Sequence, residues 1–62
     1  SVNKTLSVGT QGKVTTALRP AGKARFGERL VDVVAVAEFI DKGADVEIVE
    51  IHGNRVVVKK VG

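Results

Sequence analysis

Valine is the residue that most restricts how this chain can fold. The sequence of 62 residues contains thirteen valines but only two phenylalanines, with no tryptophan and no tyrosine. β-branched side chains are stiff and pack well on a pleated surface, so this usage favours strands. No window of 11 residues places its apolar side chains along one stripe of a helix. The chain is therefore predicted to be all-β, and its length allows a single domain.

Alternation of apolar and polar residues predicts five short strands, at residues 12–18, 23–26, 29–35, 45–52 and 55–61. The expected inward residues are Val14, Thr16, Leu18, Ala24, Phe26, Val31, Val33, Ala35, Val46 and Ile48. Ile51 comes one position late for this alternation, which predicts a bulge near Val49. Leu6 and Val8 are expected to extend the first strand beyond a bend at Gly9.

Glycine and proline mark the turns between the strands. Arg19-Pro20-Ala21-Gly22 is predicted to form a type I turn in which Gly22 is left-handed. Gly27-Glu28 and Gly53-Asn54 are predicted to form two-residue hairpin loops. Five strands joined mostly by hairpins predict a small closed barrel, because closure removes exposed strand edges.

The segment between the third and fourth strands breaks the alternation. Ala37-Glu38-Phe39-Ile40 is predicted to form a single turn of helix that is closed by Gly43. Phe39 and Ile40 would then close one end of the core.

The charge is distributed unevenly along a chain whose net charge is +3. Residues 1–29 carry six cations and one carboxylate, a net charge of +5, whereas the remainder carries four cations and six carboxylates, a net charge of −2. Such asymmetry marks either an electrostatic face or a solvated pattern that the fold mixes by placing the two halves side by side.

The residues give little support for catalysis or cofactor binding. There is no cysteine and a single histidine, which argues against disulfides and zinc, and no cofactor is expected. Ser1 and Ser7 lie near the start of the chain, and His52 borders a hairpin turn with no third group placed to orient it. The domain itself is therefore not expected to be an enzyme.

The sequence indicates a soluble segment of a longer protein. No stretch approaches the roughly 20 apolar residues that span a bilayer, and nothing at the start resembles a signal peptide. The absence of methionine suggests that the sequence is a piece of a longer chain.

Single-stranded nucleic acid is one candidate ligand, because small five-stranded barrels bind it with a basic groove and stacked aromatic rings. Lys13, Lys23 and Arg25 are expected on one outer face, but Phe26 and Phe39 are both expected in the core. Phosphate contacts alone would give weak binding that depends on salt, so nucleic acid is the less favoured ligand.

A protein partner is the other candidate. Its contact surface would be the upper or lower loops of the barrel, or the outward row of Arg19, Lys23 and Arg25, which are the candidate contact residues. The same cations have a second interpretation, as charges that keep the domain soluble and protect a strand edge.

The order of these signals resembles a known family. The stretches VGTQGKVTTALRPAGKARFGERLVDVVA and AEFIDKGADVEIVEIHGNRVVVKKV resemble the soluble C-terminal domain of NfeD-like proteins, from Val8 to Val61. The parts that carry the resemblance are Leu18-Arg19-Pro20 with Gly22, Gly27-Glu28-Arg29, Asp32-Val33-Val34-Ala35, Glu38-Phe39-Ile40 with Lys42-Gly43, and Gly53-Asn54-Arg55. With this resemblance, residues 1–6 are expected to be a linker and residues 7–62 the domain.

The resemblance implies a five-stranded OB-fold barrel at the end of a membrane protein implicated in the regulation of membrane protease activity. Long relatives carry a ClpP-like serine protease domain ahead of their membrane helices, and no catalytic residue carries over to this chain. The implied partner is a stomatin-like membrane protein or a membrane protease. The implied location is the cell membrane, as a soluble domain of a membrane protein; both sides of the membrane stay open, and the cytoplasmic side is favoured.

Overall fold

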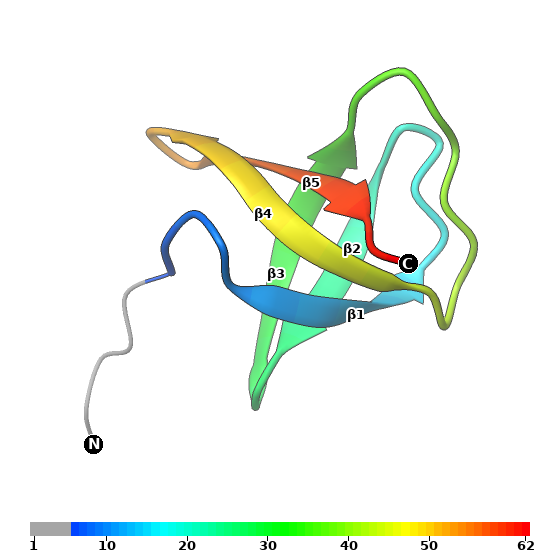
Figure 1. The fold of residues 1–62 in the computed structure, drawn as a ribbon, viewed down its shortest axis with the longest axis horizontal. Coiled ribbons are helices and arrows are strands. Elements are labelled where there is room, and N and C mark those ends of the chain that lie inside the picture. Colours follow the sequence, from blue (N-terminus) through cyan, green and yellow to red (C-terminus); the bar gives the residue numbers. More distant parts are fainter. Residues whose placement is uncertain (1–5) are drawn as a thin grey trace.

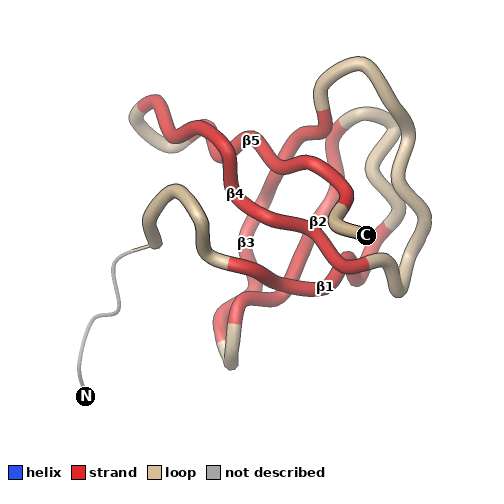
Figure 2. The backbone as a smooth tube through the Cα atoms, viewed as in Figure 1, coloured by secondary structure: helices blue, strands red, loops and turns tan. Residues whose placement is uncertain are grey.

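The computed structural model describes residues 6–62, and five strands in it close into a barrel (Figure 1). The strands are β1 (Gln11–Thr16), β2 (Ala21–Phe26), β3 (Arg29–Ala35), β4 (Asp45–His52) and β5 (Arg55–Lys60). Their order round the barrel is β1-β2-β3-β5-β4, and only the pairing of β3 with β5 is parallel. Figure 2 shows that loops and turns connect the strands, with no helix between residues 6 and 62. The prediction of a small OB-fold-like barrel is therefore confirmed.

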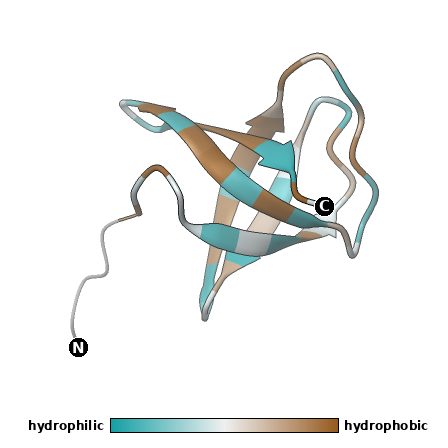
Figure 3. Cartoon of the chain, viewed as in Figure 1, coloured by the Kyte–Doolittle hydropathy of each residue, from teal (hydrophilic) through white to brown (hydrophobic). Residues whose placement is uncertain are grey.

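The core lies inside the barrel and is built from alternate residues of the strands. Hydropathy alternates along the ribbon in Figure 3, as expected for strands with one face on a core. Most of the inward residues predicted from the alternation are buried, including Phe26, of which 6% is exposed. The buried strand residues that form the core are Val14, Ala24, Phe26, Val33, Ala35, Val46, Ile48, Val56 and Val58.

The first strand is shorter than predicted, and the direction of Thr16 was predicted wrongly. The pairing of β1 with β2 shifts register between Val14 and Thr16, so Thr16 is exposed. Leu18 is fully buried beyond the strand, where it pairs with Ile40 through two backbone hydrogen bonds of 2.8 and 3.1 Å. An extra residue in the strand reverses the faces of the residues that follow, which explains the error.

The type I turn with a left-handed Gly22 is also wrong. The Arg19–Pro20 peptide bond is cis, β2 begins at Ala21, and Gly22 lies within that strand opposite Val33. The φ angle of Gly22 is not positive. A Cβ at this position would lie 2.5 Å from the carbonyl oxygens of both Thr16 and Ala17. Glycine is needed here for close backbone approach and not for its left-handed conformation.

The predicted helical turn between the third and fourth strands is absent from the structure. The backbone bonds that join Ile40 to Leu18 hold this part of the loop extended, and Ala37 has a φ of 67°. Neighbouring residues of an extended chain point to opposite sides. Ile40 is therefore buried, as predicted, whereas Phe39 is 72% exposed and lies outside the core.

The hairpins and the bulge in the fourth strand are confirmed. Gly27 and Gly53 both adopt positive φ in turns that join paired strands. The pairing of β4 with β5 shifts register between Ile48 and Glu50, which is where the late arrival of Ile51 predicted a bulge. The last strand ends at Lys60, one residue earlier than predicted.

The start of the described chain does not extend β1 as a strand. A turn at Val8 and Gly9 precedes it, Gly9 has a φ of 99°, and Val8 is exposed. Two backbone hydrogen bonds join Gly9 and Thr10 to Ile48, and Leu6 is partly buried against the core. Residues 1–5 of the predicted linker lie outside the described residues.

Candidate functional site

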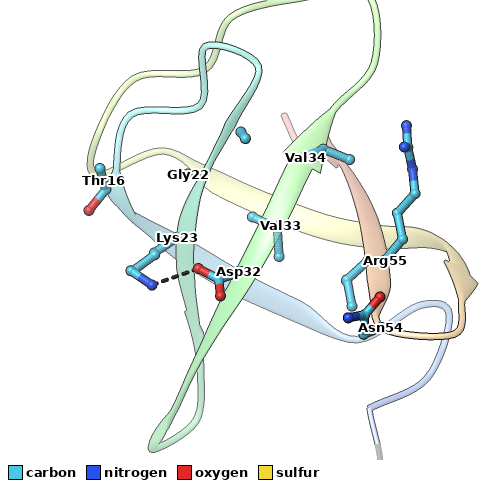
Figure 4. A pocket seen from close by; sticks show the side chains of 10 residues that line it. Thr16, Gly22, Lys23, Asp32, Val33, Val34, Asn54 and Arg55 are labelled. Atoms are coloured by element: carbon cyan, nitrogen blue, oxygen red, sulfur yellow. Dashed lines mark hydrogen bonds and ion pairs between the residues drawn. The ribbon is translucent and has the colours of Figure 1, made fainter.

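A groove lies on the outer face of β2 and β3, and the start of β5 bounds its other side. Its volume is about 390 Å³. Figure 4 shows Lys23 and Asp32 on one side of the groove and Asn54 and Arg55 on the other. Val33 and Val56 are buried and form part of its floor. The groove thus combines a small apolar floor with charged and amide groups at its rim.

The groove exists because β3 and β5 pair over only a short distance. Their ladder consists of Val34 with Val57 and Ala35 with Val58. Before Val34, β3 continues as a hairpin with β2, and before Val56, β5 turns back into β4 through Gly53 and Asn54. The two strands therefore separate where the ladder ends, and the hairpin between β4 and β5 brings Asn54 and Arg55 beside β3.

The charges at the groove are partly neutralised within it. Lys23 and Asp32 are partners in the β2–β3 ladder, and Nζ of Lys23 lies 2.6 Å from Oδ1 of Asp32. Both side chains remain well exposed, at 48% and 83%, so the pair contributes little to stability. Among the described residues, the side chains of Asn54 and Arg55 have no hydrogen-bond or ion-pair partner. Arg55 is thus the free cation of the groove.

The structure brings only one of the three predicted contact residues into the groove. Lys23 lines it, whereas Arg25 is exposed farther along β2, between Lys13 of β1 and Leu30 of β3. Arg19 is exposed in the loop that precedes β2. Lys13, placed on the same outer face by the sequence, is exposed and contacts Asp45 at 2.9 Å.

Sequence reasoning missed Asn54 and Arg55 as groove residues. The Gly53-Asn54 hairpin was predicted, and with it the position of Arg55 at the start of a strand. Which other strands this hairpin faces depends on how the barrel closes and on where β3 and β5 stop pairing. The alternation of residues within one strand carries no signal for that arrangement.

Ser7 and His52, which the sequence offered as candidates for chemistry, are both exposed in the structure. No group of three or more metal-ligating side chains occurs among residues 6–62. His52 contacts Glu50 at 2.5 Å on the surface, and the hydroxyl groups of Ser7 and Thr10 lie 3.4 Å apart. Neither contact places a nucleophile, a base and an orienting group together. Ser1 lies outside the described residues.

An aromatic platform for stacking bases is also missing from the groove. Phe26 is buried, and the exposed ring of Phe39 belongs to the β3–β4 loop and not to the groove lining. In the part of the chain that the structure describes, no helix has the length and hydropathy needed to cross a membrane.

Comparison with known proteins identifies the family. The sequence model of the NfeD-like C-terminal, partner-binding domain matches residues 5–60. The chain belongs to this family. The NfeD-like domain is 32% identical over 54 residues to the membrane protein NfeD1b of Bacillus subtilis (strain 168), and the match covers 87% of this chain. It spans only about 12% of the length of that relative.

Two solved structures resemble the NfeD-like domain. The C-terminal domain of stomatin operon partner protein 1510-C from Pyrococcus horikoshii is 25% identical, with a TM-score of 0.84, and the match covers 89% of this chain and 88% of that one. The other is the soluble domain of a membrane protein implicated in regulation of membrane protease activity from Corynebacterium glutamicum. It is 19% identical, with a TM-score of 0.78 and coverage of 89% and 92%, and it supports the fold alone.

Proposed function

We propose that this NfeD-like domain is a noncatalytic module that binds a stomatin-like membrane protein or a membrane protease, as part of a membrane-anchored protein that regulates membrane protease activity. The observation that carries the proposal is the match of residues 5–60 to a partner-binding domain family. A stomatin-like partner is proposed because the similar Pyrococcus protein is a stomatin operon partner. The chemistry of the described residues agrees, because their exposed charges are spread over strands and converge on no reacting centre.

The proposed contact surface is the outer face of β2, with Arg19, Lys23 and Arg25. Arg19 and Arg25 have no ion-pair partner among residues 6–62, so both are available to carboxylates of a partner. We also propose that the domain is tethered at the cell membrane by a segment that the described residues do not include, and that it lies on the cytoplasmic side; the similarity to a membrane protein supports the tether.

A binding measurement tests this proposal. The 62-residue chain is immobilised, and a purified stomatin-like protein encoded beside the corresponding gene is passed over it. We expect saturable binding of the parent chain. The triple variant Arg19→Glu, Lys23→Glu, Arg25→Glu should weaken this binding at least about tenfold, because its glutamates would repel the carboxylates of the partner.

The matched control is the triple variant Lys42→Glu, Lys59→Glu, Lys60→Glu, which changes the net charge equally at exposed positions outside this surface. It should bind nearly as well as the parent chain. Equal weakening by both triple variants would show a general charge effect and contradict the proposed surface. No binding of the parent chain would contradict the proposed function.

Titration with a labelled single-stranded oligonucleotide tests the alternative function, which is binding of single-stranded nucleic acid. A weak nucleic-acid binder would bind at about 50 mM salt and lose most of its affinity at about 200 mM, because phosphate contacts release counterions. We expect no binding at the lower salt concentration.

A further inference from the structure

The edge of β3 that faces β5 is only partly paired with another strand. The backbone N–H of Ala35 donates to the carbonyl of Pro20 at 2.9 Å, which fixes the residues of β3 that bond to β2. In an antiparallel ladder such residues alternate, so Val31 and Val33 bond to β2 whereas Leu30 and Asp32 direct their backbone groups away from it. The ladder with β5 begins only at Val34. The backbone groups of residues 30 and 32 therefore form an open edge.

The side chains around this edge suit an extended polypeptide. Leu30 is 54% exposed on the outer surface, opposite Arg25 and one pair from the end of the β2–β3 hairpin. The groove lies at the end of the open edge, where Asp32 and Val34 of β3 face Asn54 and Arg55. Lys23 neutralises Asp32, so the uncompensated charge of the groove is the cation of Arg55.

We propose that the open edge of β3 at residues 30–32 accepts an extended segment of the partner as an added strand, with an apolar side chain against Leu30 and a carboxylate that pairs with Arg55. Backbone hydrogen bonds supply affinity in this mode of recognition, and alternate side chains supply specificity. This inference rests on the proposed function, because it specifies how the partner-binding domain holds its partner.

The groove favours a polypeptide over a nucleic acid. An added strand needs a row of backbone donors and acceptors, and residues 30 and 32 provide it. A single-stranded nucleic acid needs aromatic rings for its bases, and the groove lining contains none. The carboxylate is assigned from charge complementarity, since Arg55 has no anionic partner among the described residues.

The first test uses proline and alanine at the same position. Asp32→Pro removes the backbone N–H that points away from β2, so it removes no bond of the β2–β3 ladder. Asp32→Ala also removes the ion pair with Lys23 but keeps the N–H. The probe is the stomatin-like protein of the binding measurement above. We expect Asp32→Pro to weaken binding at least about tenfold and Asp32→Ala to change it less than about threefold.

The second test uses charge reversal and amide hydrogen exchange. It does not depend on whether the Asp32→Pro variant folds. Arg55→Glu should weaken binding at least about tenfold, whereas Lys42→Glu, an equal charge change in the β3–β4 loop, should not. In the complex, hydrogen exchange of the Leu30 and Asp32 amides should slow at least about tenfold.

The outcomes distinguish the two proposals. Binding of the parent chain with unchanged exchange at Leu30 and Asp32, or with equal effects of Arg55→Glu and Lys42→Glu, overturns the added strand and leaves the partner-binding function standing. Failure of the parent chain to bind overturns both. Displacement of the partner by a single-stranded oligonucleotide of about 12 nucleotides would also overturn the polypeptide assignment.

Discussion

Replacing Leu18 by alanine is expected to lower the free energy of unfolding by about 3 kcal/mol, within the range for deleting a buried leucine side chain. Leu18 is fully buried and fixes the loop before β2 to the loop before β4 through its pairing with Ile40. A domain of this length has a total free energy of unfolding of roughly 3–9 kcal/mol. The variant should therefore unfold at a much lower urea concentration than the parent chain.

Leu30→Ala is the matched control, because it removes the same atoms from a side chain that is 54% exposed. It should lower the free energy of unfolding by less than about 1 kcal/mol, because folding removes little of the apolar surface of Leu30 from water. Similar losses for the two variants would contradict the burial of Leu18 at the end of the barrel.

Gly22→Ala is expected to be comparably destabilising, by about 3 kcal/mol, because it forces a methyl group against backbone that is held by the sheet. The added Cβ would lie 2.5 Å from the carbonyl oxygens of Thr16 and Ala17 and 2.7 Å from Cδ2 of Leu18. Urea unfolding monitored by circular dichroism measures the loss.

Substitution by asparagine distinguishes a glycine that is required for close backbone approach from one that is required for a left-handed conformation. At Gly27, where φ is +66° and no atom lies within 4 Å of the added Cβ, asparagine should cost less than alanine because it tolerates positive φ. At Gly22, asparagine should cost at least as much as alanine because its side chain is larger. A milder effect of asparagine than of alanine at Gly22 would indicate positive φ and contradict the structure.

The parts of the fold that could be predicted from the sequence are those in which local signals act alone. The bounds of β4 follow from alternation between Gly43 and Gly53, and the bulge follows from the single phase shift between Ile48 and Ile51. The Gly27 and Gly53 turns require positive φ, which glycine adopts without steric cost. These features need no knowledge of distant contacts.

The errors occur where contacts between neighbouring chain segments decide the local structure. Gly22 has the sequence appearance of a turn residue, but the approach of Thr16 and Ala17 places it inside a strand. Phe39 was expected in the core because it adjoins Ile40, yet the pairing of Ile40 with Leu18 turns Phe39 to solvent. Barrel closure brings Leu18 and Ile40 together, whereas the approach of Thr16 to Gly22 accompanies the register shift between β1 and β2.

The same limit applies to the candidate site. Lys23 was predicted as an outward cation because it alternates with the inward Ala24 and Phe26, and the structure adds its pairing with Asp32. Arg55 becomes a groove residue only because β5 diverges from β3 before Val34. An OB-fold-like barrel hosts many functions, so the assignment of a protein partner depends on this surface and on the family, not on the fold.

The most direct test of the central claim, that the β2–β3 face binds a protein partner, is an NMR titration of the labelled chain with the stomatin-like protein. We expect amide resonances of residues 21–26, 30–34 and 53–56 to shift or broaden together on addition of the partner. Changes confined to β4, around Glu47 and Val49, would contradict it.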